Sequence, residues 1–200
     1  MFDNFKKSFL TILDSPHLFS GDLEKFEKLF RQNQDPWNFN SSAYEKKRFS
    51  MIMEFVGPIK PQSILELGCA EGHLTKYLWH VCHNIEAVDI SKTAIQRVEK
   101  IVPGVKFILG DFTKMNFPKK FSLIVASEVL YYLKEREIIR FFENCQTDYL
   151  LTANFWNLFK KKENLIRKYH FKKIKDRWVF HFEFGFPFPK ITHICLWKKS

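Results

Sequence analysis

The sequence lacks the features that mark several specialised classes of protein. No apolar run reaches the ~20 residues that a membrane-spanning helix needs, so no membrane span is predicted. The N-terminus has no basic segment followed by a long apolar stretch, which argues against a secretory signal and makes the cytoplasm the expected location. Internal repeats and low-complexity tracts are absent, which excludes repeat architectures.

Patterns typical of metal sites and disulfide frameworks are missing as well. The four cysteines, Cys69, Cys82, Cys145 and Cys195, form no C-x-x-C pair and are irregularly spaced. Neither a zinc site nor a disulfide framework is therefore predicted, and buried free thiols are expected. The seven histidines show no metal-ligand spacing, so no bound metal is expected.

The composition is that of a globular chain with an uneven charge. Hydrophobic residues make up 46 % and charged residues 27 % of the 200 residues, which suits one domain with a sizeable core. Residues 157–200 hold 12 Lys and Arg against 3 Asp and Glu, so +9 of the net +10 lies there. Such a surface attracts anionic substrates, nucleic acid or membranes, but an ordinary solvated lysine-rich face is the favoured interpretation.

The first part of the chain is predicted to be helical. Residues 5–13 and 23–30 space their apolar side chains as amphipathic helices do. A third helix is expected from about Ser42 to Val56, ended by Gly57 and Pro58. We therefore expect one domain over residues 1–200, with residues 1–60 as a helical cap on a core formed by residues 61–200.

From residue 61 onward, strand-like runs alternate with helical segments, which predicts a parallel sheet with helices on both faces. The two last runs, 174–184 and 191–198, are joined closely enough to pair antiparallel. The predicted fold class is therefore α/β, a doubly wound seven-stranded sheet, mostly parallel with a C-terminal antiparallel hairpin. In such sheets ligands bind beyond the carboxyl ends of the strands. The five predicted parallel strands are 63–67, 85–89, 105–109, 121–126 and 149–153.

The strongest motif is E-L-G-C-A-E-G, residues 66–72, between the first strand and the next helix. Gly68 permits positive φ and close approach of a ligand, and the helix that follows Gly72 offers free N–H groups. The spacing differs from the G-x-G-x-x-G of dinucleotide-binding folds. Glu66 at the strand end would repel a pyrophosphate, but it suits a ligand that carries an ammonium and a sulfonium.

Acidic residues also end the next two predicted strands. A carboxylate at Asp89 can accept hydrogen bonds from both hydroxyls of a ribose, or it can merely cap the following helix. Asp111 suits the exocyclic amine of adenine and Phe112 can stack on the base, whereas the alternative for Gly110-Asp111 is a simple turn. Because three successive strand ends would meet at one edge of the sheet, we favour ligand binding for both carboxylates.

The motif S-E-V-L-Y-Y, residues 127–132, follows the fourth predicted strand. Glu128 could accept a proton from an attacking amine or could only orient the loop, and the sequence leaves both alternatives open. Tyr131 is the second candidate for a catalytic proton acceptor. Three further residues of these strand ends complete the predicted cofactor contacts: Cys69, Ile90 and Ser127.

In this order, the motifs resemble those of class I S-adenosylmethionine methyltransferases over about residues 60–155. The segment D-P-W-N-F at 35–39, followed by Ser42, Tyr44, Glu45 and Arg48, is similar to the nodulation protein S group. The resemblance implies a Rossmann-like fold, S-adenosyl-L-methionine as cofactor with S-adenosyl-L-homocysteine as product, and an amine of an amino-sugar oligosaccharide as methyl acceptor. The chain departs from many members at Ala70, where they have a third glycine.

The resemblance also implies roles for the N-terminal segment, which would close over the cofactor. Trp37 and Tyr44 would supply aromatic walls, although packing alone is the alternative for Tyr44, and Arg48 would pair with the methionine carboxylate. The expected reaction is an in-line displacement at the sulfonium methyl group, in which the protein positions a neutral nucleophile and excludes water.

Two other functions use the same fold. A nucleic-acid (RNA) methyltransferase would account for the basic C-terminal region, but it calls for an Asn/Asp-Pro-Pro-Tyr type of motif where this chain has Ser-Glu-Val-Leu. A non-catalytic module that binds the cofactor is the second alternative. The sequence does not identify the acceptor beyond a small molecule or saccharide, and it leaves the oligomeric state open.

Overall fold

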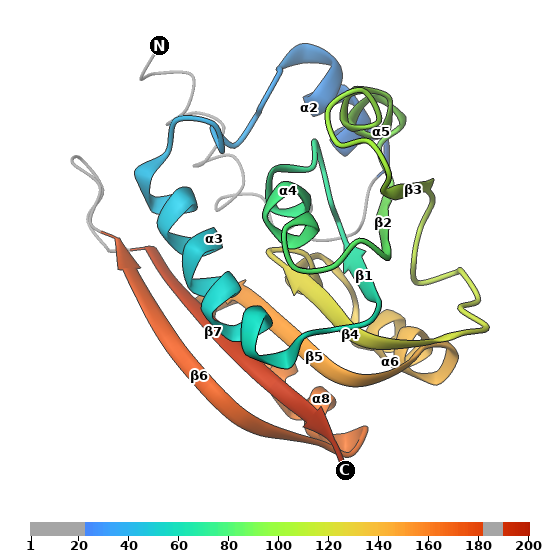
Figure 1. Cartoon of the computed structure of the whole chain (residues 1–200), viewed down its shortest axis with the longest axis vertical. Coiled ribbons are helices and arrows are strands. Elements are labelled where there is room, and N and C mark those ends of the chain that lie inside the picture. Colours follow the sequence, from blue (N-terminus) through green and yellow to red (C-terminus); the bar gives the residue numbers. More distant parts are fainter. Residues whose placement is uncertain (1–22, 182–189) are drawn as a thin grey trace.

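The computed structural model describes residues 23–181 and 190–200, so the helix predicted over residues 5–13 and the loop before the last strand lie outside the described residues. A seven-stranded sheet forms the centre of the described part, in the order β3-β2-β1-β4-β5-β7-β6 (Figure 1). The strands are β1 (Ile64–Leu67), β2 (Ile85–Asp89), β3 (Lys106–Leu109), β4 (Lys120–Ser127), β5 (Gln146–Phe155), β6 (Phe171–His181) and β7 (Lys190–Lys199).

Strands β1 to β5 pair in parallel, and β7 lies antiparallel between β5 and β6. The predicted fold class, with its single antiparallel C-terminal hairpin, is thus confirmed. Every residue of β1 and β2 is buried, as expected for parallel strands covered on both faces.

Helices cover both faces of the sheet (Figure 1). One apolar cluster joins the sheet to α3, α4 and α5, and a second joins the opposite face to α6 and α8. No helix among residues 23–181 and 190–200 is long and apolar enough to cross a membrane. The helices are α2 (Leu23–Gln32), α3 (Ala43–Val56), α4 (His73–Trp79), α5 (Lys92–Val98), α6 (Glu135–Asn144), α7 (Trp156–Phe159) and α8 (Glu163–Lys168), with 3-10 turns η2 (Gly57–Ile59), η3 (Leu130–Tyr132) and η4 (Lys160–Lys162).

Serine caps begin two of these helices. The Ser42 hydroxyl accepts a hydrogen bond from the Glu45 N–H at the start of α3, and Ser91 accepts one from the Ala94 N–H at the start of α5. Strand β6 begins at Phe171, three residues earlier than predicted, because Phe171 is buried against Phe142 of α6.

Helix α2 is joined to α5 by one carboxylate, in addition to the contacts of its aromatic side chains with Trp37 and Tyr132. Glu27 accepts hydrogen bonds from the Ser91 and Thr93 hydroxyls, at 2.7 and 2.6 Å, and from the Thr93 N–H at the first turn of α5. Burial would raise the pKa of Glu27, but these donors outweigh it and lower the pKa to about 2. The carboxylate therefore fastens α2 to the N-terminus of α5, where negative charge is favoured.

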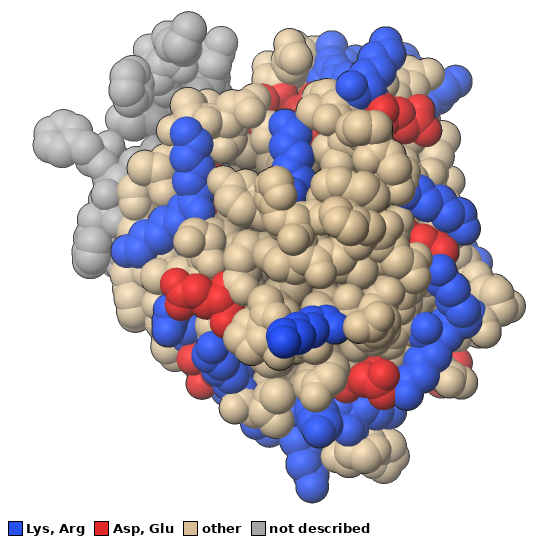
Figure 2. Space-filling model, in the orientation of Figure 1, with Lys and Arg blue, Asp and Glu red and all other residues tan. Residues whose placement is uncertain are grey.

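Some basic residues of the C-terminal part of the chain are paired with acidic residues. On the face drawn in Figure 2, Lys and Arg are spread over several sides, with Asp and Glu between them. Arg177 forms an ion pair with Glu54 of α3, and Lys173 lies 3.1 Å from Asp176. Part of the excess charge is thus engaged by acidic groups of the same surface.

Candidate functional site

A cavity of about 300 Å³ lies beyond the carboxyl ends of β1 to β4, where the strand order reverses. Residues of α2, of the segment 36–39, of α3 and of β7 complete its walls. The structure brings all the predicted site residues except Gly72 to this cavity: Trp37, Tyr44, Arg48, Glu66, Gly68, Cys69, Asp89, Ile90, Asp111, Phe112, Ser127, Glu128 and Tyr131.

The loop after β1 is shaped by Gly68 and Asp89. Gly68 has a φ of +69°, and a Cβ atom there would lie 2.8 Å from the Val129 side chain, so no larger residue fits. Asp89 accepts hydrogen bonds from the Ala70 N–H at 2.8 Å and from the Ser91 N–H at 2.9 Å. Asp89 therefore holds the loop and the start of α5 while it also lines the cavity.

Glu66 is the most deeply buried acidic group of the cavity. The Thr75 hydroxyl donates to it at 2.6 Å, and the side chain has almost no contact with solvent. Burial raises the pKa of Glu66 to about 8, and the nearby Asp89 contributes in the same direction. Burial also raises the pKa of the adjacent Cys69 thiol. A cation bound beside Glu66 and Asp89 would offset the energetic cost of burying their charges and would reduce the repulsion between them.

Asp111 has a more polar environment at the end of β3. Burial would raise its pKa, but hydrogen bonds from Thr113 and from Lys114 outweigh it and lower the pKa. The Thr113 hydroxyl donates at 2.7 Å, and the Lys114 ammonium lies 2.9 Å from the other oxygen. Phe112 packs edge-on against Phe141 of α6, with the ring centres 5.4 Å apart.

Gly72 serves the packing of helices and does not reach the cavity. It caps α4 with a φ of +75°, and a Cβ atom there would lie 2.1 Å from Val98 Cγ2 of α5. The second glycine of the E-x-G-x-x-x-G motif is therefore required by the contact between α4 and α5.

The opposite side of the cavity begins with Arg48 on α3, which is 2 % exposed. Glu45 accepts from its Nε at 2.7 Å and lies 2.5 Å from its Nη2, and Nη1 donates to the Ser127 hydroxyl. Burial would lower the pKa of Arg48, but Glu45 and Glu128 raise it, so the guanidinium stays charged. These contacts use three of the five guanidinium N–H groups, which leaves two that they do not use.

Glu128 holds three strands together at this side. Its main chain has a φ of +55°, and its N–H donates to the Ala153 carbonyl at 2.7 Å. One carboxylate oxygen accepts from the Phe155 N–H and the other from the Thr192 hydroxyl, both at 3.1 Å. The Thr192 hydroxyl is also 2.5 Å from the Tyr44 hydroxyl. Burial raises the pKa of Glu128, whereas the charge of Arg48 lowers it.

Aromatic rings form the rest of the lining. Tyr131 donates to the Tyr132 hydroxyl at 3.5 Å, and burial raises the pKa of both phenols, that of Tyr132 to about 12. Trp37 stacks on Phe39 and packs edge-on against Phe30 of α2. Both tyrosines therefore stay protonated at neutral pH. The rings of α2 and of the segment 36–39 line one side of the cavity.

The cavity thus has two sides, one formed at the ends of β1, β2 and β3 and the other mainly by α3 and β7. The β1–β3 wall comprises Glu66, Gly68, Asp89 and Asp111, and the α3–β7 wall comprises Tyr44, Arg48, Glu128 and Thr192. Sequence reasoning missed Thr192, for which no local signal exists. It also missed Glu45 as the partner of Arg48, although the spacing of three residues on a helix indicates that pair.

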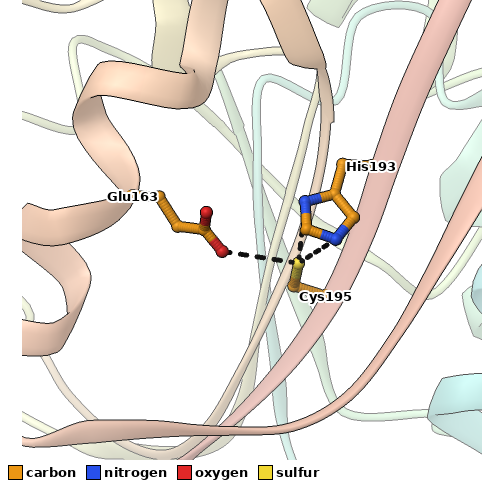
Figure 3. A group of neighbouring side chains, drawn as sticks. All are labelled: Glu163, His193 and Cys195. Carbon is orange, nitrogen blue, oxygen red and sulfur yellow. Dashed lines mark hydrogen bonds between the residues drawn. The ribbon is translucent and has the colours of Figure 1, made fainter.

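Two clusters in the described residues combine acidic side chains with histidine or cysteine. In the first, Glu163 at the start of α8 meets His193 and Cys195, which both belong to β7 (Figure 3). The Cys195 sulfur is 3.4 and 3.3 Å from the two ring nitrogens of His193, and Nε2 of that ring also lies 2.8 Å from Asp176. Lys173 lies 3.4 Å from Glu163, so the chain supplies a positive charge here itself.

The second cluster, Asp35, Glu71 and His73, lies at the edge of the cavity. Asp35 accepts from two main-chain N–H groups, and Glu71 accepts from Arg97 at 2.6 Å. Because these carboxylates already bind donors of the chain, we assign neither cluster to a metal.

Comparisons with known proteins agree with this architecture. A family model described as Nodulation protein S (NodS) matches residues 23–178. Nodulation protein S of Azorhizobium caulinodans is 36 % identical over 110 residues, and that of Sinorhizobium fredii is 34 % identical over 113 residues. Each alignment covers 54 % of this chain but only 53 % and 51 % of the relatives, so the chain spans about half the length of the curated relatives it matches.

Among solved structures, the N-methyltransferase NodS from Bradyrhizobium japonicum WM9, in complex with S-adenosyl-L-homocysteine, matches with a TM-score of 0.74. The match covers 92 % of this chain and 99 % of that one, and at 18 % identity it shows the fold. The family model extends from α2 into β6 and so includes most of the cavity. The chain therefore belongs to the nodulation protein S family.

Proposed function

We propose that this protein is an S-adenosyl-L-methionine-dependent methyltransferase that transfers a methyl group to an amine of a small molecule or saccharide, most consistently an amino-sugar. The observation that carries the proposal is the β1–β3 wall, in which three successive strands each place an acidic residue at or near their carboxyl ends around one cavity. Membership of the nodulation protein S family supports it, as does the shared fold with a relative whose structure contains S-adenosyl-L-homocysteine.

The donors and acceptors of the cavity fit the proposed cofactor. The Asp89 carboxylate would accept from the ribose hydroxyls, and Asp111 would accept from the adenine amine. Glu66 would compensate the ammonium group, since a nearby cation favours the charged form of a buried carboxylate. Arg48 would direct its two remaining donors toward the cofactor carboxylate. The volume of about 300 Å³ also lies in the range of small-molecule sites.

Apart from Arg48, the residues of the α3–β7 wall would face the acceptor. When bound, the cofactor supplies a methyl group already activated on a sulfonium. The chain therefore has to exclude water, align the acceptor nitrogen with that methyl group and remove one proton. The rings of Trp37, Tyr44 and Tyr131 line the cavity and would pack against the apolar faces of a sugar.

Binding of the cofactor is tested by isothermal titration with S-adenosyl-L-homocysteine, with NAD as the negative control. Asp111→Asn should weaken binding by about tenfold or more, since it replaces a charged acceptor. The matched control is Asp148→Asn, because Asp148 pairs with Lys120 on the surface and does not line the cavity. No heat of binding with S-adenosyl-L-homocysteine would contradict the proposal.

Transfer is tested by incubating the protein with S-adenosyl-L-methionine and de-N-acetylated chitooligosaccharides, followed by mass spectrometry of the sugar. Addition of one methyl group to the amine is the expected result. Cofactor binding without transfer to any amine would favour the non-catalytic module, and transfer to RNA alone would favour the nucleic-acid enzyme.

A further inference from the structure

Three side chains of the α3–β7 wall form a continuous line of hydrogen bonds. The Thr192 hydroxyl donates to Glu128 at 3.1 Å and lies 2.5 Å from the Tyr44 hydroxyl. A hydroxyl has only one proton, so Thr192, which gives its proton to Glu128, must accept from Tyr44. The line therefore has a fixed direction, from Tyr44 through Thr192 to Glu128.

All three side chains line the cavity, and Tyr44 is the end of the line that has acceptor capacity to spare. Because its proton points to Thr192, the lone pairs of its oxygen are available to an N–H group of a ligand. The ring is held in place by stacking on His181, with the ring centres 4.9 Å apart. The phenol is thus fixed in position by Thr192 and His181 in the lining of the cavity.

We propose that Tyr44 and Thr192 relay a proton from the acceptor amine to Glu128. The inference deepens the proposed methyl transfer and rests on it. The protonated amine gives one proton to the Tyr44 oxygen as the Tyr44 proton moves to Thr192 and the Thr192 proton moves to Glu128. The amine lone pair then forms the new N–C bond while the S–C bond breaks, and its electron pair stays on sulfur. After product release, the same line returns the proton from Glu128 to water in the cavity.

The electrostatics of the three groups suit a relay. Burial raises the pKa of Tyr44 well above its usual range, and Glu128 adds to this, so Tyr44 remains a phenol and passes protons without storing a negative charge. Burial raises the pKa of Glu128 while Arg48 opposes the rise, which keeps a carboxylate of increased basicity at the end of the line. Tyr131 also interacts with Glu128, and its hydroxyl lies 3.5 Å from that of Tyr132, so Tyr131 stands outside the line that runs through Thr192.

The test measures methyl transfer to a de-N-acetylated chitooligosaccharide by the full chain. Thr192→Val replaces the hydroxyl with a methyl group of similar size. It should lower kcat about 100-fold, the usual contribution of proton transfer. KM and the affinity for S-adenosyl-L-homocysteine should stay unchanged. Thr192→Ser restores the hydroxyl and should restore kcat to within a few-fold. Thr147→Val is the matched control, because Thr147 is a buried threonine of β5 that lies outside the cavity.

A double variant separates a relay from independent packing effects. Tyr44→Phe should lose about as much kcat as Thr192→Val, and the combined variant should lose no more than either, since both interrupt one line. In deuterated water, the wild-type kcat should fall with a curved dependence on deuterium fraction, as expected when several protons move together. Thr192→Val should lose that curvature.

The outcomes distinguish the relay from the function on which it rests. An unchanged kcat in Thr192→Val overturns the relay and leaves the methyltransferase intact, because Glu128 then accepts the proton directly. Equal losses in Thr192→Val and Thr192→Ser, or purely additive losses in the double variant, also overturn it. A wild-type protein that binds S-adenosyl-L-homocysteine but methylates no amine refutes the proposed function, and the relay falls with it.

Discussion

The two walls of the cavity are built in opposite ways. In the β1–β3 wall, the hydrogen-bond partners of the three carboxylates lie within 19 residues of them: Asp111 accepts from Thr113, and Asp89 accepts from Ser91 and Ala70. In the α3–β7 wall, the Tyr44–Thr192 contact spans 148 residues and the Arg48–Ser127 contact spans 79. The first wall is therefore formed by neighbouring strands and their turns, whereas the second exists only after distant elements have packed together.

The largest expected effect on stability comes from removing Arg48, which belongs to the α3–β7 wall. Arg48→Met removes a buried guanidinium and leaves the partly buried Glu45 and Ser127 without their partner, which should lower the free energy of unfolding by about 3 kcal/mol. Urea denaturation measures it. Arg31→Met is the control, since Arg31 pairs with Glu27 on a helix in the same way but its side chain is 70 % exposed, and a change below about 1 kcal/mol is expected. Similar losses in both variants would show that long-range burial is not what distinguishes Arg48.

A glycine beside the β1–β3 wall tests how far local geometry alone sets stability. Gly72→Ala should lower the free energy of unfolding by about 2 kcal/mol, because the alanine is strained at positive φ and its Cβ collides with Val98. Gly57→Ala is the control: Gly57 has helical dihedral angles and no atom within 4 Å of a new Cβ, so a small gain is expected. Thermal denaturation of the two variants should diverge, and equal melting temperatures would contradict the argument.

Glu66 gives the β1–β3 wall a characteristic pH dependence. Its pKa is about 8 in the folded protein and near the ordinary 4.5 when unfolded, so the folded state holds a proton that the unfolded state releases between these values. Wild-type stability without ligand should therefore fall as the pH rises from about 5 to 8. Glu66→Gln should abolish this contribution and be more stable by about 2 kcal/mol at pH 6, with a larger difference toward pH 8. Urea denaturation at several pH values checks it, and a difference that does not change with pH would refute it.

The smallest expected effect on stability concerns Asn154 of β5, which lies on the face of the sheet opposite to Thr192. Asn154 is 1 % exposed, and neither atom of its amide group has a hydrogen-bond partner in the described structure. Asn154→Leu removes this unpaired group and should raise the free energy of unfolding by about 1 kcal/mol. Thr152→Val on the same strand should do the reverse, because the Thr152 hydroxyl accepts from Trp197. Calorimetry of both variants gives the sign, and a loss in Asn154→Leu would count against the argument.

The difference between the walls also explains what the sequence could predict. Buried strands and their acidic ends produce short, recognisable patterns, so the sheet and residues such as Asp89 and Asp111 were found from the sequence. Serine caps at Ser42 and Ser91 are local for the same reason. The placement of Tyr44 and Arg48 came only from the family resemblance.

Other features had no pattern to reveal them. Thr192 is an ordinary strand residue until β7 brings it to Glu128, and α7 is only four residues long, too short to show a helical period. The motif predicts Gly72 as a ligand contact, but a glycine needed for helix packing and one needed for a ligand look the same in a sequence.

The interior position of β7 has a consequence for synthesis on the ribosome. This strand inserts between β5 and β6, which both precede it in the chain. Until residues 190–199 emerge, β5 and β6 each have an unpaired edge, and such edges invite association with other chains. Thr192 arrives with the same strand. A chain cut anywhere before residue 190 would therefore lack β7 and Thr192 and would leave strand edges unpaired, so such a fragment should tend to associate with other chains.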